Sequence, residues 1–189
     1  PFLAKALEQT RKSSGNEHPR TLVSMGNLGS VLESLGDVDG AVALFEEAYD
    51  TSMRVFGKTH TETYYATLNL ARLELRRKDF ERAGPLFRQN YDTWNKAGGA
   101  KHPRTRAAQK ELAVFLLNLQ QHHRKRSEFT QAVTALEEAR QHYITLVGAE
   151  HAAIQLCVEQ YVKLYDAWHK AEPDQGHEES AAKWRAQLK

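Results

Sequence analysis

The chain has 189 residues, of which 41% are apolar and 26% charged, with a formal net charge of +2 at pH 7. This composition is ordinary for a folded protein, and so small a charge gives no reason to expect nucleic acid as a partner. Cys157 is the single cysteine, which excludes a disulfide framework and a cysteine-based metal cluster. The apolar runs are too short to span a bilayer. The first residues have neither an initiating Met nor an apolar signal segment, which predicts a cytoplasmic protein.

The sequence repeats with a period of 42 residues. A histidine opens each unit and a threonine follows three residues later, at His18, His60 and His102 with Thr21, Thr63 and Thr105. A fourth histidine, His151, comes 49 residues after the third, as if seven residues were inserted. Self-similarity at this period predicts stacked supersecondary units. Such arrays usually present binding surfaces, so function is sought on a face of the array.

The first two segments in the chain predict one helix and then a helix pair. Residues 1–15 align with the second half of a unit, so we expect a truncated repeat with further repeats before it. Repeat 1 covers residues 16–57, and its first helix begins at Pro19 because proline suits the first helical position. Gly36 is expected to end that helix with a positive φ angle. Asp37 is expected to cap the second helix, which ends before Gly57.

The later units follow the same plan with three differences. Repeat 2 covers residues 58–99 and has Lys78 in the place of Gly36, with Asp79 as the cap. Repeat 3 covers residues 100–148, and its first helix is expected to end near Gln121. The insertion at residues 121–127 is expected to lengthen the turn that follows. Residues 149–189 form a terminal capping helix pair, whose last helix is short and polar, as suits the end of a stack.

These residues resemble the tetratricopeptide repeat, in the 42-residue form found in kinesin light chains. The small and large residues that match the packing positions of the family are Asn27, Leu28, Gly29, Leu32, Gly36, Ala41, Phe45 and Ala48. The resemblance implies an all-α fold, a right-handed α-solenoid of antiparallel helix pairs forming one array over residues 1–189. The tail is similar to the ends of bacterial repeat regions beside Ser/Thr kinase domains. That similarity implies a part in a larger bacterial signalling protein.

The resemblance also implies a function, namely binding a peptide or a partner helix in a concave groove lined by the first helix of each repeat. The positions that correspond to the groove are Asn27, Ser30, Glu33, Ser34, Tyr65, Asn69, Arg72, Arg76, Lys110, Glu111 and Asn118. An asparagine amide both donates and accepts, so Asn27 and Asn69 are suited to holding a peptide backbone. The positive charge of Arg72, Arg76 and Lys110 favours an acidic partner.

Three alternatives compete with a peptide-binding groove. The same polar residues are also typical of a solvated helix face, and the array is also suited to a structural spacer or a self-association surface.

Catalysis is not expected, because no nucleophile elbow, phosphate-binding glycine loop or zinc-protease motif occurs in the sequence. No cofactor is expected. No metal is expected either, because the histidines that open the repeats are about one helix pair apart, too far to share an ion.

Overall fold

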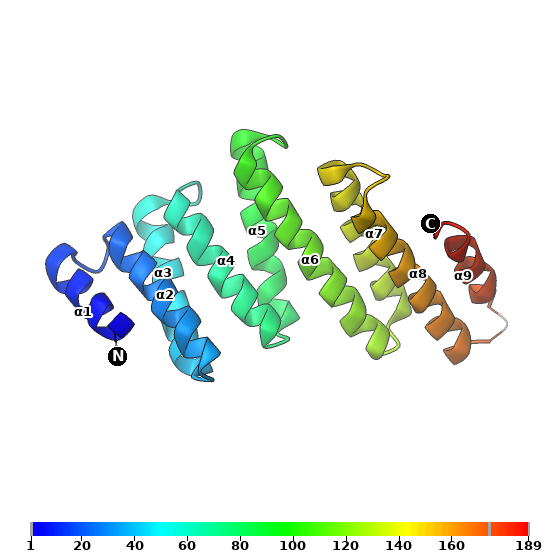
Figure 1. Ribbon diagram of the computed structural model, residues 1–189, viewed down its shortest axis with the longest axis horizontal. Coiled ribbons are helices and arrows are strands. Elements are labelled where there is room, and N and C mark those ends of the chain that lie inside the picture. The colour runs from blue at the N-terminus through cyan, green and yellow to red at the C-terminus, as the bar shows by residue number, and fades with distance from the viewer. Residues whose placement is uncertain (1, 174, 189) are drawn as a thin grey trace. The chain divides into compact units, whose positions relative to one another are not determined.

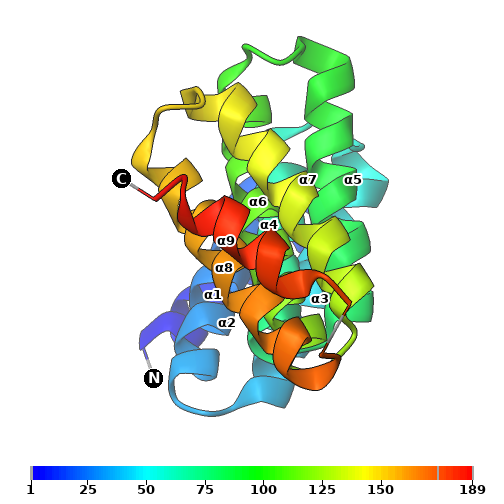
Figure 2. The same ribbon diagram turned by 90° about the vertical axis from the view of Figure 1, so that its right-hand side faces the viewer.

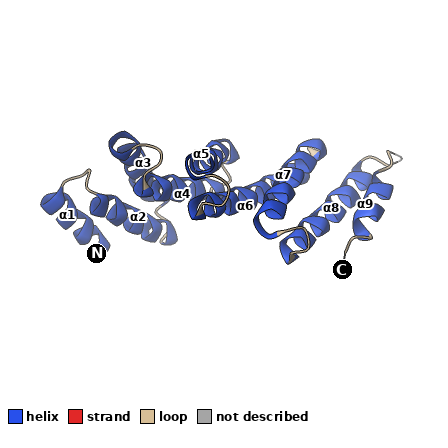
Figure 3. Ribbon diagram, turned by 90° about the horizontal axis from the view of Figure 1, so that it is seen from above, coloured by secondary structure: helices blue, strands red, loops and turns tan. Residues whose placement is uncertain are grey.

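The structure, a computed structural model, describes residues 2–173 and 175–188. Every regular element in this part of the chain is a helix (Figure 3). The chain divides into two compact units, residues 1–102 and residues 103–189, which are described separately. Unit 1 holds α1 (Phe2–Ser14), α2 (Pro19–Ser34), α3 (Val38–Phe56), α4 (Thr61–Arg76) and α5 (Phe80–Gly98). Unit 2 holds α6 (Pro103–Lys125), α7 (Phe129–Val147), α8 (Ala152–Ala171) and α9 (His177–Arg185). None of these helices is long and apolar enough to cross a membrane.

The repeated histidines stand at the helix starts, as the sequence predicts. In three of them the ring Nδ1 atom accepts a hydrogen bond from the backbone N–H two residues later. The distances are 3.1 Å from His18 to Arg20, 3.2 Å from His60 to Glu62 and 3.1 Å from His151 to Ala153. Each bond satisfies one of the backbone donors that a helix start leaves unpaired.

In the first two repeats the threonine that follows the histidine ties the helix to the preceding turn. Thr21 Oγ1 donates to the carbonyl oxygen of Gly15 over 2.7 Å, and Thr63 Oγ1 donates to that of Gly57 over the same distance. Both glycines have positive φ angles, so each one ends the previous helix in the left-handed region. In these two turns the histidine therefore caps the start of the following helix, and the threonine bonds to the glycine that ends the preceding helix.

The turns inside the helix pairs of repeats 1 and 2 are also built as predicted. Gly36 has a φ of 86°, and Lys78 takes the same left-handed conformation with a φ of 63°. Asp37 and Asp79 then cap α3 and α5, each accepting a backbone N–H over 3.0 Å through Oδ1. The replacement of glycine by lysine at position 78 thus leaves the turn intact.

The prediction that the insertion at residues 121–127 lengthens a turn is wrong. Helix α6 runs on to Lys125 and has 23 residues, whereas α2 and α4 have 16 each. The seven extra residues extend the helix by about two turns, since an α-helix has 3.6 residues per turn. Seven residues leave the apolar stripe within roughly 20° of its old direction, so the packed face is preserved. Ser127, with a φ of 61°, then makes the turn that Gly36 and Lys78 make.

The core of unit 1 is shared between neighbouring helices. One buried cluster joins α1, α2, α3 and α4, and a second joins α3 and α4 with Leu86 of α5 packed against it. Helix α2 also contacts α4 directly, so the first helices of successive repeats lie side by side (Figure 1). Both clusters extend over more than one helix pair, so the pairs of unit 1 bury apolar surface against their neighbours, as stacked repeats do.

In unit 2 the most extensive helix–helix contact is between α6 and α7. Stacked aromatic rings join α8 to α9. Figure 2 displays α9 lying along α8. The rings of Tyr161 and Trp184 stack with centroids 3.9 Å apart, and those of Trp168 and His177 with centroids 4.0 Å apart. Cys157 is fully buried, as its place in an apolar pattern predicts, and burial raises the pKa of its thiol to about 11.

Candidate functional site

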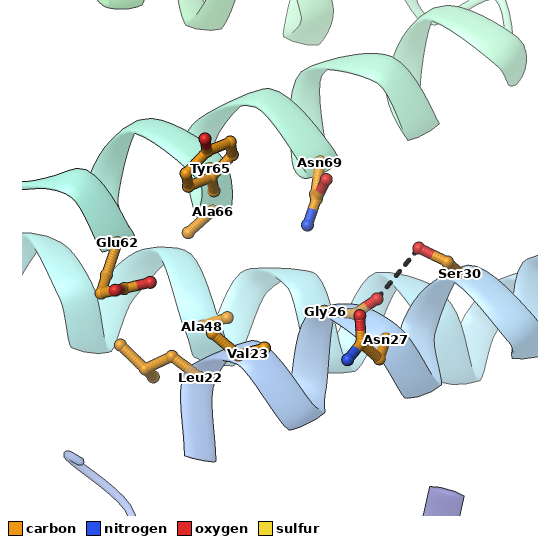
Figure 4. A pocket seen from close by; sticks show the side chains of 10 residues that line it. All are labelled: Leu22, Val23, Gly26, Asn27, Ser30, Ala48, Glu62, Tyr65, Ala66 and Asn69. Atoms are coloured by element: carbon orange, nitrogen blue, oxygen red, sulfur yellow. Dashed lines mark hydrogen bonds between the residues drawn. The ribbon is translucent and has the colours of Figure 1, made fainter. Parts of the chain in front are cut away.

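A pocket of about 330 Å³ lies between α2 and α4 in unit 1 (Figure 4). We call it the α2–α4 pocket. Its wall on the α2 side consists of Leu22, Val23, Gly26, Asn27 and Ser30. Its other wall consists of Glu62, Tyr65, Ala66 and Asn69 of α4, with Ala48 of α3. Four of the residues predicted for the groove, Asn27, Ser30, Tyr65 and Asn69, are thus brought together in one place.

The two asparagines share this pocket because they hold the same position in successive repeats, 42 residues apart. Asn69 reaches over Gly26, where a Cβ atom would lie only 3.1 Å from its Nδ2 atom. A residue larger than glycine at position 26 would therefore require the Asn69 amide to shift. Neither amide hydrogen bonds to another residue in the described part of the chain. Both therefore keep donors and an acceptor for a ligand.

The charges of unit 1 differ from those expected of a positive groove. Arg76 forms a two-pronged ion pair with Glu33 through its Nε and Nη2 atoms, so its charge is balanced within the protein. Arg72 also has an interaction partner. Among the described residues that line the α2–α4 pocket, Glu62 is the charged one, and its carboxylate forms no ion pair with another described residue.

A second pocket, of about 480 Å³, lies in unit 2 between α6, the end of α7 and the start of α8. We call it the α6–α8 pocket. Its lining residues are Arg106, Ala107, Lys110, Tyr143, Leu146, Val147, His151 and Ala153. Arg106 Nη2 donates to the carbonyl oxygen of Leu146 over 2.9 Å. Neither Arg106 nor Lys110 has a carboxylate within ion-pair distance in the described part of the chain.

The polar groups of the α6–α8 pocket are donors. Burial is the main cause that raises the pKa of Tyr143, and the charges of Cys157 and Glu111 add to it, so the phenol keeps its proton. His151 accepts the Ala153 N–H at Nδ1, which leaves its Nε2–H as a donor. The pocket is therefore suited to an acceptor that carries negative charge.

The other residues predicted for the groove do not line either pocket. The Ser34 hydroxyl donates to the carbonyl of Val31 over 2.7 Å, and the Asn118 amide donates to that of Val114 over 2.8 Å. Both bonds lie within the residue's own helix. Glu111 lies close enough to Tyr143 to affect its pKa. The role predicted for these three residues stays a prediction.

Sequence reasoning missed several residues that line the pockets, among them Glu62, Gly26 and Arg106. Glu62 stands three residues before Tyr65 and seven before Asn69, so helical spacing alone places it on their face of α4. That signal was available in the sequence. No comparable signal existed for Gly26 or Arg106, whose importance depends on a neighbouring helix. No group of three or more His, Cys, Asp or Glu residues in the described ranges is arranged to hold a metal ion.

Comparison with known proteins shows which proteins have a similar arrangement of helices. Residues 1–54 match the sequence profile of the tetratricopeptide repeat. The chain is similar in structure to the kinesin light chain TPR-like repeats of Podosopora anserina, with a TM-score of 0.66 and 22% identity over 98% of this chain and 85% of that one. A variant of that protein gives a TM-score of 0.67 at the same identity, covering 98% and 82% of the two chains.

A third solved structure extends the comparison to BtubC (BKLC) from P. vanneervenii. Its TM-score is 0.60, with 17% identity over 98% of this chain and 71% of that one. No curated protein sequence matches the chain. At such identities the structures define the fold alone. The protein has the all-α, helical-repeat fold of the kinesin-light-chain-like tetratricopeptide repeats, which confirms the fold class that the resemblance implied.

Proposed function

We propose that the protein is an interaction module that binds an extended peptide in the α2–α4 pocket. The observation that carries this proposal is that the amides of Asn27 and Asn69, equivalent in successive repeats, line one pocket and bond to no other side chain or backbone group among the described residues. An extended peptide presents backbone donors and acceptors at regular intervals. Amides at repeated positions can pair with them in both directions.

The rest of the pocket is consistent with a peptide. Tyr65 is 53% exposed and Val23 is 50% exposed, so apolar surface flanks the polar groups. Pockets that bind ligands commonly combine apolar walls with a few polar groups that fix orientation. Tetratricopeptide repeats generally mediate protein interactions, and that general role supports binding over catalysis for this chain.

The partner of unit 2 is proposed to be acidic. Arg106 and Lys110 line the α6–α8 pocket, and no carboxylate among residues 2–173 and 175–188 pairs with them; the Tyr143 hydroxyl and the His151 ring can donate there as well. Charge complementarity of this kind favours specificity and a faster encounter. Of the three cations that suggested an acidic partner, Lys110 is the one that lines a pocket.

The test is a peptide display screen against the protein, followed by titration of the recovered peptides. Asn69→Ala is expected to weaken their binding by about 1–3 kcal/mol, because a desolvated backbone group loses its partner. Asn16→Ala removes an exposed asparagine outside the pocket and serves as the matched control. Its affinity should equal that of the wild type, and circular dichroism should show both variants to be as helical as the parent.

Two outcomes would favour the alternative of a spacer or self-association surface. One is a screen that recovers no specific peptide. The other is a set of peptides whose affinity is the same for the wild type and for Asn69→Ala, which would place their binding elsewhere. Sedimentation of the free protein at several concentrations would then separate a spacer, which stays monomeric, from a self-associating surface.

A further inference from the structure

Glu62 differs from the other acidic residues of unit 1 that lie between helices. Glu47 pairs with Arg11 over 2.6 Å, Glu46 pairs with Arg82 over 2.5 Å, and Glu33 pairs with Arg76. Glu62 lines the α2–α4 pocket and has no cation paired with it among the described residues. Its backbone N–H is used by the His60 cap, but its carboxylate remains available. A carboxylate that borders a partly enclosed pocket is a ready acceptor for a cationic donor.

The groups beside Glu62 fit the rest of a basic side chain. Figure 4 displays the carboxylate extending into the space between α4 and α2, beside Leu22, Ala66 and Val23. Long cationic side chains bury their methylene stems on apolar surface while the charged end stays near water. Tyr65 adds an aromatic ring at the edge of the pocket, and a cation over such a ring gains further attraction.

We propose that the α2–α4 pocket selects a lysine or arginine side chain of the bound peptide, with Glu62 as its counter-ion. The inference rests on the proposed peptide-binding function and adds the chemistry of one residue of the ligand. An acidic residue at the same place would meet the like charge of Glu62. The preference of this pocket is therefore opposite to that proposed for the α6–α8 pocket.

The nearest cation on the facing helix does not already fill this role. Arg20 holds on α2 the position that Glu62 holds on α4, 42 residues later. It is exposed, and no ion pair joins it to Glu62 in the structure. Arg72 stands on α4 beyond Asn69 and has a partner of its own. Neither of these two arginines therefore balances the charge of the Glu62 carboxylate.

The experiment uses three pools of amidated nonapeptides with lysine, glutamine or glutamate fixed at the centre and small uncharged residues elsewhere. Each pool is titrated into the 15N-labelled full chain, and the side-chain amide signals of Asn27 and Asn69 report binding. The lysine pool is expected to bind about fivefold more tightly than the glutamine pool, as suits a partly exposed ion pair. The glutamate pool should bind more weakly than either. Rising salt should reduce these differences because it screens exposed charges.

Variants at position 62 test the assignment directly. Glu62→Gln should remove the difference between the lysine and glutamine pools while binding of the glutamine pool persists. Glu62→Lys should reverse the order so that the glutamate pool binds best. Asp50→Asn is the matched control, because Asp50 is an exposed acid of α3 outside the pocket, and it should keep the wild-type order.

The outcomes separate this inference from the proposed function. If all three pools shift the two amide signals with equal affinity, peptide binding stands and the role of Glu62 is overturned. A lysine preference that survives in Glu62→Gln overturns it as well. If no pool shifts the amide signals, both the peptide-binding function of the pocket and the basic selectivity fail together.

Discussion

At the scale of single residues, Glu74 carries a buried charge where the repeat favours an apolar residue. The positions 42 residues before and after it are Leu32 and Leu116. Its side chain is fully buried, and its carboxylate lies 2.9 Å from Arg77 Nη1 and 2.8 Å from Arg82 Nη1. A buried carboxylate is tolerated only while cations and donors compensate for its lost hydration. Arg77, on the turn after α4, and Arg82, in the first turn of α5, provide that compensation.

We expect Arg82→Ala to lower the free energy of unfolding by about 1–3 kcal/mol, because it leaves a buried charge with one cation instead of two. Glu74→Leu should cost little or be stabilising, since it restores the residue type of the neighbouring repeats and removes the buried charge. The double variant should recover most of the loss. Urea unfolding followed by circular dichroism measures all three. Equal losses in the two single variants, adding up in the double, would mean that the ion pair is irrelevant to stability.

At the scale of helices, Tyr161 of α8 connects three elements of unit 2. Its ring stacks on Trp184 of α9 at an interplanar angle of 3°. Its hydroxyl donates to the Glu137 carboxylate on α7. This hydrogen bond is the largest of the causes that lower the pKa of Glu137, and Gln141 and Arg140 add to it. Burial and the same bond raise the pKa of Tyr161, so the phenol keeps its proton.

Tyr161→Phe keeps the stacked ring and removes the donor, which allows the bond to be tested by pH. A carboxyl whose folded-state pKa is lowered stabilises the protein above its unfolded pKa, about 4.3, and this contribution is lost as pH falls through the folded value. The stability difference between wild type and Tyr161→Phe should therefore be largest near pH 7 and shrink on acidification. Tyr165→Phe is the matched control, and its difference should not vary with pH over this range. A Tyr161→Phe difference that is constant with pH would contradict the assignment.

At the scale of the whole molecule, the chain consists of two compact units whose cores are built from neighbouring helices. Ala83 lies in unit 1, on α5, and is fully buried. Ala43, on α3, is exposed. Overpacking at Ala83 should be felt first by the helices that share its core, because stacked repeats interact mainly with their neighbours.

Ala83→Leu is expected to cost about 1–3 kcal/mol by overpacking, and Ala43→Leu should cost almost nothing. Hydrogen exchange measured by mass spectrometry shows which helices lose protection in the variant. Peptides from residues 2–102 should exchange faster in Ala83→Leu, while peptides from residues 103–188 keep their wild-type protection. An equal loss of protection in both ranges would mean that the two units open as one.

The sequence alone determined the helical elements and their class. Helix starts, caps and turns depend on a few residues close together in the chain, so the recurrence of His18, Thr21 and Asp37 was sufficient to predict the helix boundaries of repeats 1 and 2. The 42-residue period predicted stacked helical units, and the resemblance of the packing residues to the tetratricopeptide repeat implied the fold. Local reasoning failed at the insertion, because residues 121–125 are polar and looked like a turn. Seven residues make nearly two helical turns, so extending the helix kept its packed face.

Only the tertiary structure decided which charges remain available to a ligand. Arg76 seemed free to attract an acidic partner, yet it pairs with Glu33 on the neighbouring helix. Glu62 was not predicted as a site residue, yet it lines the α2–α4 pocket, and no cation in the described part of the chain pairs with it. Ion pairing depends on distances of a few ångströms between side chains from different helices. The spacing of residues along one helix determines which side chains share a face of that helix. The packing of two helices determines which of those side chains contact side chains of the other helix.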